Sequence, residues 1–248
     1  MSKTRKAMEF AHFAATQGWG AFRGKPNRGN ELYRSVWYGQ QCRLPRVSIE
    51  TLFPGIEDVD ITLVSPLHEE GGNVWVNELV VLAGVCRLLK PKHVFEIGTF
   101  NGRTTVNLAA NSPLDAIVHT LDIPHDHPKF APVEGEERFQ LHENNGAFYR
   151  KSAYAPRVDQ LWADSAEFDV TPLIGQIDLA FIDGSHNYDY VKNDTEKVMA
   201  MMAPGGVVFW HDYHPQYPDV AQYLEESSSS RYHIETTSLV VQRKGGKG

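Results

Sequence analysis

The sequence predicts an α/β protein in which a mainly parallel sheet is covered by helices on both faces. From residue 73 onward, short apolar runs alternate with stretches of helical spacing, as in parallel strands joined by helices. The runs are continuously apolar, which is typical of strands buried on both faces. Ligands bind at the carboxyl edge of such sheets, so the acids that close five of these runs are candidate site residues. They are Glu96, Asp122, Asp164, Asp183 and Asp212.

The individual elements follow from apolar spacing, capping residues and helix breakers. Asn73 is a candidate N-cap for a helix that Pro91 ends. Pro204-Gly205-Gly206 indicates a break between a helix and the strand after it. Strands are expected at residues 93–97, 116–123, 158–163, 177–182, 207–210, 232–235 and 239–242. Further helices are expected at residues 102–110, 134–144, 188–202 and 219–226.

Composition indicates a folded, water-soluble protein. Of its 248 residues, 42% are hydrophobic and 22% charged, which suits one large α/β domain with an attached segment. A net charge of -7 without a basic stripe excludes nucleic acid as an expected partner. The most apolar stretch, residues 74–89, contains Glu78 and Arg87 and is too polar to span a membrane. Two cysteines cannot form a disulfide framework, so we expect a reducing, cytoplasmic location.

Residues 1–60 are expected to form an N-terminal arm or lid, residues 61–243 the main domain, and residues 244–248 a disordered tail. The arm has loop signals and five aromatic residues that require burial. Packing on the chain's own core is the simplest way to bury them, and contact with a second copy, giving a homo-oligomer, is the alternative. The five are Trp19, Phe22, Tyr33, Trp37 and Tyr38.

The turn after the first strand of the domain is the expected cofactor pocket. Gly98 and Gly102 let the backbone turn sharply and approach a ligand, and the helix that follows offers free N–H groups. The dinucleotide pattern G-x-G-x-x-G is absent, because Phe100 stands where a second close glycine would be. Glu96 would repel a pyrophosphate and suits a positively charged group, such as the ammonium of an amino acid.

The stretch from Glu96 to Thr104 resembles motif I of the class I S-adenosylmethionine-dependent methyltransferases. It is most similar to the form found in the catechol and caffeoyl-CoA type O-methyltransferases. Residues 181–186, F-I-D-G-S-H, resemble a strand-four signature of a related group of small-molecule methyltransferases, and Pro204-Gly205-Gly206 is also typical of the class. The resemblance covers about residues 73–243. It implies a Rossmann-like, doubly wound sheet of seven strands with one antiparallel strand, S-adenosylmethionine as cofactor, and a small-molecule hydroxyl as acceptor.

The resemblance also implies which residues hold the cofactor. The turn would bind the methionine end, the end of the second strand the ribose, and the end of the third strand the adenine. The implied set is Glu96, Gly98, Thr99, Phe100, Gly102, Thr104, Asp122, Ile123, Asp164, Ser165 and Asp183.

Two routes for activating the acceptor hydroxyl remain open. Asp183 and Asp212 close neighbouring strands, which lie ~4.8 Å apart, so both carboxylates can reach one divalent ion such as Mg²⁺. In the catechol-type relatives an Asp-Asn pair stands where this chain has His211-Asp212. Histidine suits a transition metal or a base better than Mg²⁺, so His211 is a candidate third ligand and the need for a metal stays open. The other route is a general base, for which His211 is the first candidate and His186 the second, with Asp183 beside them.

Two alternatives to a methyltransferase remain. One is an NAD-dependent oxidoreductase on a similar sheet, although the missing glycine pattern counts against it. The other is a binding module that keeps the cofactor pocket without catalysis.

Overall fold

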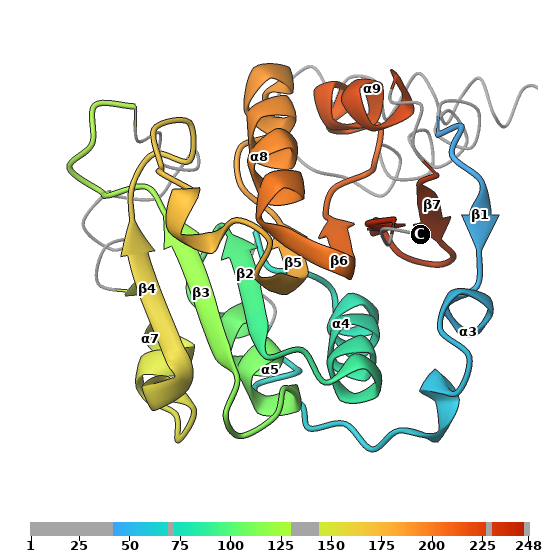
Figure 1. Cartoon of the computed structure of the whole chain (residues 1–248), viewed down its shortest axis with the longest axis horizontal. Helices are drawn as coiled ribbons and strands as arrows, with labels where there is room; N and C mark the ends of the chain where they lie inside the picture. The colour runs from blue at the N-terminus through green and yellow to red at the C-terminus, as the bar shows by residue number, and fades with distance from the viewer. Residues whose placement is uncertain (1–41, 69–71, 130–143, 227–229, 246–248) are drawn as a thin grey trace, which may run out of the picture.

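The computed structural model describes residues 42–68, 72–129, 144–226 and 230–245 (Figure 1). The five aromatic residues predicted to need burial in the arm lie outside the described residues. So do nearly all of the helix expected at 134–144 and most of the predicted tail.

The described part of the chain forms one eight-stranded sheet, in the order β1-β7-β8-β6-β5-β2-β3-β4. Only β8 is antiparallel to its neighbours, and the other pairs are parallel, so the predicted Rossmann-like sheet with one antiparallel strand is confirmed. The eighth strand, β1, comes from the predicted arm. The strands are β1 (Arg46–Val47), β2 (His93–Ile97), β3 (Ile117–Asp122), β4 (Val158–Trp162), β5 (Ile177–Ile182), β6 (Met202–Trp210), β7 (Tyr232–Ile234) and β8 (Val240–Arg243).

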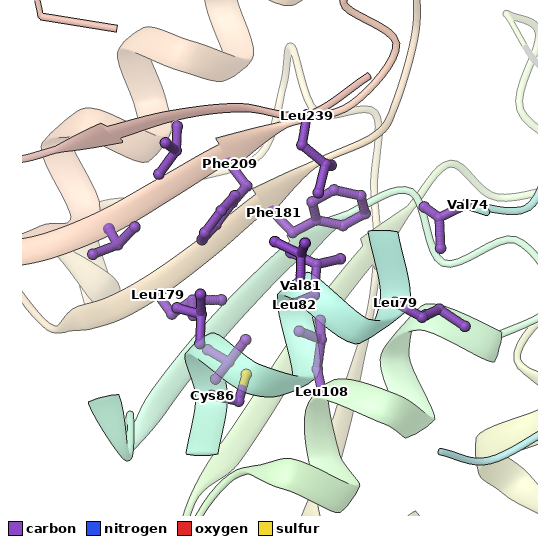
Figure 2. Close-up of a cluster of buried hydrophobic side chains, with 14 of the residues drawn as sticks. Val74, Leu79, Val81, Leu82, Cys86, Leu108, Leu179, Phe181, Phe209 and Leu239 are labelled. Carbon is purple, nitrogen blue, oxygen red and sulfur yellow. The ribbon is translucent and has the colours of Figure 1, made fainter. Parts of the chain in front are cut away.

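Helices cover both faces of the sheet, because successive strand residues point to opposite sides. On one face, alternate strand residues such as Leu179 and Phe181 pack with α4 and α5 (Figure 2). On the other face, Phe95 and Ile182 pack with α8 and α9. The helices are α3 (Ile49–Leu52), α4 (Val76–Leu89), α5 (Arg103–Asn111), α7 (Ala147–Arg150), α8 (Tyr188–Met201) and α9 (Pro218–Glu226), with single turns η1 (Ile56–Asp58), η2 (Ala155–Arg157) and η3 (Thr171–Leu173). None of the helices in the described residues is long and apolar enough to span a bilayer.

Two local predictions were wrong. The N-cap of α4 is Trp75 and not Asn73, because the Glu78 side chain accepts a hydrogen bond from the Trp75 N–H at 2.8 Å. Strand β6 begins at Met202, so Pro204-Gly205-Gly206 lies inside a strand instead of ending a helix. The pairing of β5 with β6 is irregular after Ile177, and such an irregularity accommodates proline and glycine.

The chain reverses its direction across the sheet between β2 and β5. Strands β2, β3 and β4 run outward on one side, and the chain then returns to add β5 on the other side of β2. In sheets of this kind ligands bind outside the carboxyl ends at the point of reversal. The turn at 98–102 and the β5 end at Asp183 meet there, where the Asp183 N–H donates to the Ile97 carbonyl at 2.9 Å.

Candidate active site

A cavity of about 1430 Å³ opens at this carboxyl edge. Pockets for one drug-sized ligand measure about 300–1,000 Å³, so this cavity is larger than one such ligand needs. Ten of the residues predicted for the site line it: Gly98, Phe100, Asp122, Ile123, Asp164, Ser165, Asp183, His186, His211 and Asp212.

Gly98 and Phe100 shape the turn at the mouth of β2. Gly98 has φ +97°, and a Cβ there would lie 2.0 Å from the Asp183 carbonyl oxygen. Glycine is therefore required for the ends of β2 and β5 to close on each other. Phe100 also has a left-handed backbone, with φ +46°, and its N–H donates to Asp122 at 2.9 Å. Phe100 thus takes a conformation usually reserved for glycine, and such outliers concentrate at functional sites.

Glu96 does not reach the cavity, contrary to the predicted contact with an ammonium group. Strand alternation turns it toward α5, where it is fully buried and accepts hydrogen bonds from Thr105 at 2.5 Å and Thr120 at 2.6 Å. Burial raises its pKa to about 8, although these hydrogen bonds act in the opposite direction. Glu96 is therefore mainly protonated at neutral pH and serves as a buried support under the turn.

Thr99, Gly102 and Thr104 also lie outside the cavity lining. The Thr99 hydroxyl is bonded to Thr120 at 2.7 Å, and Gly102 is closely packed against Gly146, so these residues hold the turn in place. Next to them, Arg103 is buried and also lies outside the cavity lining. Its guanidinium donates at 2.7–2.9 Å to three carbonyl oxygens of the segment before α4, those of Ser65, Pro66 and Val74.

Asp122 is held at the end of β3 by three donors. They are the Phe100 N–H at 2.9 Å, the Ile123 N–H at 2.8 Å and the Asn145 side-chain amide at 2.7 Å. Burial raises the pKa of Asp122, and these donors moderate the shift. Asn145 was not predicted from the sequence. It lines the cavity, and its Oδ1 is buried without a hydrogen-bond partner in the described residues, so it is an acceptor available to a ligand.

Asp164, at the predicted adenine end, already has partners. It accepts from Lys129 Nζ at 2.7 Å, from the Tyr190 hydroxyl at 3.0 Å and from the Ala166 N–H at 2.9 Å. Burial favours a higher pKa for Asp164, but these donors outweigh it and lower the pKa. Lys129 and Tyr190 line the cavity and were not predicted, because they lie outside the strand ends.

A cluster of carboxylates surrounds His211 at the end of β6. Its Nδ1 lies 2.9 Å from Asp183 Oδ1 and 3.4 Å from Asp212 Oδ2, and its Nε2 lies 3.0 Å from Glu78 Oε2. Burial alone would lower the pKa of His211, but Asp183 and the other carboxylates raise it well above its usual value. These contacts favour the protonated ring, which is a poor general base, and this argues against His211 as the first candidate for that role. Glu78 was missed, since its only sequence signal is an acid in the first turn of an apolar helix.

His186 pairs with Asp212 on the open side of this cluster. Its Nε2 lies 2.7 Å from Asp212 Oδ2, and its ring stacks on Tyr217 with the ring centroids 4.0 Å apart. Asp212 has a left-handed backbone, with φ +57°, as is frequent for residues constrained at a functional site. Burial would raise the pKa of Asp212, but hydrogen bonds from His186 and His211 hold it well below its usual range. Asp212 is therefore a carboxylate at neutral pH.

Comparisons with known proteins agree with this architecture. A family model described as a methyltransferase domain matches residues 95–213. Similar solved structures include the O-methyltransferase TomG from Streptomyces achromogenes, involved in tomaymycin synthesis and in complex with SAM. It has a TM-score of 0.53 and 16% identity, covering 83% of this chain and 99% of that one.

Two further structures have the same fold. The O-methyltransferase from Bacillus cereus in complex with SAH has a TM-score of 0.51 and 16% identity, with 79% and 100% of the two chains covered. The SAH-bound methyltransferase PaMTH1 from Podospora anserina has a TM-score of 0.52 and 14% identity, with 90% and 98% covered. A search of curated protein sequences gave no significant match.

The fold, the cavity at the point of reversal and the matched domain together define an enzyme that transfers methyl groups. Residues 95–213 match a methyltransferase domain, and the chain has the fold of O-methyltransferases that were solved in complex with SAM or SAH. The alternative of an NAD-dependent oxidoreductase does not agree with the matched domain.

Proposed function

We propose that the protein transfers a methyl group from S-adenosylmethionine to a hydroxyl of a small molecule, with His186 as the general base. The pairing of His186 with Asp212 at the cavity wall carries this proposal. Its Nε2 is bonded to Asp212 at 2.7 Å, and its Nδ1 has no hydrogen-bond partner in the described part of the chain. A ring that donates from one nitrogen to a carboxylate keeps the lone pair of the other nitrogen available for a proton.

The cofactor is expected in the part of the cavity between Gly98 and Asp164. S-adenosylmethionine, when bound, supplies a methyl group that is already activated on a sulfonium. The chain fits this ligand, because Asp122 ends β3 where an acid receives ribose hydroxyls, and Asn145 adds an unpartnered acceptor beside it. Asp164 and Ser165 stand at the adenine end.

The acceptor is expected on the other side, where His186 and Tyr217 line the cavity together with Trp75. The Trp75 side chain is 69% exposed, so it offers an apolar wall for a small molecule. His186 would take the hydroxyl proton as the methyl group arrives. Asp212 would orient the ring and stabilise the imidazolium that forms. Positioning both ligands in one cavity would contribute much of the rate.

The metal-assisted route does not fit the donor set. Asp183, His186 and Asp212 each present an oxygen or nitrogen within 4.8 Å of the others. These atoms are already engaged, since His186 is bonded to Asp212 and the His211 ring contacts both carboxylates. His211, the third predicted ligand, carries protons on the nitrogens that would have to bind the metal. The proposed reaction therefore involves no divalent ion.

The test is methyl transfer by His186→Asn. Wild-type protein and variant would be incubated with S-adenosylmethionine labelled on its methyl group and with catechol, a monophenol or an aliphatic polyol. Loss of a general base lowers kcat by about 10²–10⁴-fold, while calorimetric affinity for S-adenosylmethionine stays unchanged. His119→Asn, a histidine outside the cavity, is the matched control.

Three results would count against the proposal. Absence of S-adenosylmethionine binding would reject the cofactor site. Binding without turnover on any acceptor would favour the non-catalytic module. A full rate in His186→Asn would reject His186 as the base.

A further inference from the structure

We infer that the side chain of His211 is an internal cation, filling the position between Asp183 and Asp212 that a bridging divalent ion would otherwise take, and that Glu78 keeps it there. The inference deepens the proposed methyl transfer by making it independent of metal. Its test is a binding measurement that does not require turnover.

The contacts of the ring define its protonation. Nδ1 faces Asp183 at 2.9 Å and Asp212 at 3.4 Å, while Nε2 faces Glu78 at 3.0 Å. Ionised carboxylates only accept hydrogen bonds, so both ring nitrogens must donate. A ring with a proton on each nitrogen carries a positive charge and has no lone pair for a metal.

The charges of the cluster depend on one another. His211 has a side-chain exposure of 8%, and a cation buried to this extent is costly unless it is paired. Asp183 and Asp212, with exposures of 16% and 18%, would in turn repel each other without a positive charge between them. The imidazolium meets both requirements, as a divalent ion between the two carboxylates would.

Glu78 is fixed from three directions, which makes it a positioning residue. Its Oε1 accepts from the N–H and the hydroxyl of Ser238 at 2.7 and 2.8 Å. Its Oε2 accepts from the Trp75 N–H at 2.8 Å and from His211. Glu78 is 1% exposed, and two backbone donors hold its carboxylate whatever the cavity contains. The His211 ring is therefore held from the side opposite Asp183.

The first measurement is binding of Mn²⁺, followed by electron paramagnetic resonance in the presence of S-adenosylhomocysteine. We expect little binding to the wild type. His211→Asp removes the internal cation and supplies a third carboxylate, so it is expected to bind Mn²⁺ at least ~10-fold more tightly. The double variant Asp183→Asn/His211→Asp is the matched control and is expected to lose this gain.

The second measurement is the long-range ¹H–¹⁵N NMR spectrum of the histidine rings. The wild type is expected to show His211 with both nitrogens protonated at neutral pH. Glu78→Gln removes one carboxylate, so it is expected to shift His211 to a neutral tautomer, which a purely structural role of Glu78 would not do.

Two outcomes would overturn the inference. They are Mn²⁺ binding by the wild type as tight as by His211→Asp, and a neutral His211 in the wild type. The second outcome concerns the wild type alone, so the inference stays testable if the His211→Asp variant fails to fold. Failure of the wild type to bind S-adenosylmethionine would instead reject the proposed function, and it leaves the Mn²⁺ and NMR results unaffected.

Discussion

Gly98→Ala is expected to destabilise the protein, because the backbone of Gly98 lies directly against the backbone of Asp183. The added Cβ would lie 2.0 Å from the carbonyl oxygen of Asp183 and 2.8 Å from its carbonyl carbon. Both contacts are to backbone, so no side-chain rotation relieves them. The ends of β2 and β5 would have to separate, which weakens the hydrogen bond from the Asp183 N–H to the Ile97 carbonyl at 2.9 Å.

The magnitude follows from three contributions. A left-handed residue with a Cβ costs about 1–2 kcal/mol, overpacking about 1–3 kcal/mol, and the weakened hydrogen bond about 1 kcal/mol. We expect a loss of about 3–6 kcal/mol, which for a domain of this size lowers Tm by about 6–24 °C. Differential scanning calorimetry measures the loss, and titration calorimetry should show weaker S-adenosylmethionine binding, since Gly98 and Asp183 both line the cavity.

Gly205→Ala is the matched control. Gly205 has a comparable φ of +83°, but a Cβ there would meet nothing within 4 Å. It should therefore cost only the backbone term of about 1–2 kcal/mol and leave cofactor affinity unchanged. Equal losses of stability in the two variants would show that the contact between Gly98 and Asp183 is not the cause. Wild-type stability and cofactor affinity in Gly98→Ala would show the same.

Three other perturbations have expected outcomes. Asp122→Asn replaces one of the two carboxylate oxygens that accept hydrogen bonds from three donors. The binding free energy of S-adenosylmethionine, measured by calorimetry, should therefore weaken by about 1–3 kcal/mol, and an unchanged value would place the ribose elsewhere. Arg103→Lys cannot reach three carbonyl oxygens at once, so urea denaturation should show a loss of about 2–3 kcal/mol. The folded-state pKa of Glu96, about 8, lies above its ordinary value of 4.5. The folded protein therefore keeps a proton that the unfolded chain releases, and the stability this proton contributes is lost as pH rises through that window. Tm of the wild type should fall relative to Glu96→Gln between pH 5 and pH 8, and parallel Tm curves would contradict this.

Patterns within short stretches of sequence predicted most of the fold. Strands β2 and β5 have the predicted bounds, because continuous apolar runs flanked by breakers depend little on distant contacts. The predicted break at Pro204-Gly205-Gly206 was wrong, because the structure of this stretch does depend on contacts with another strand. Whether proline and glycine separate a helix from a strand or lie inside the strand depends on the pairing with the neighbouring strand, and the β5–β6 register shift accommodates them.

For the site, the sequence predicted which strand ends meet but not which side chains face the cavity. Glu96 lies one residue before the end of β2, so the alternation of strand residues turns it away from the edge and toward α5. Asn145 has no such signal. It reaches Asp122 from a segment beyond β3, and its neighbour Gly146 donates its N–H to the Phe100 carbonyl at 2.7 Å.

The sequence shows that His211-Asp212 departs from the pattern of the catechol-type relatives, but it does not predict the role of His211. The residue that explains it, Glu78, precedes His211 by 133 positions and lies on a helix outside the strand ends. Without Glu78, a histidine beside two aspartates reads equally well as a metal ligand or as a base. With Glu78 on Nε2 and Asp183 on Nδ1, neither ring nitrogen is left for either role. The general base that we propose is therefore His186, which lines the cavity and whose Nε2 contacts Asp212, and Asp212 in turn lies 3.4 Å from His211 Nδ1.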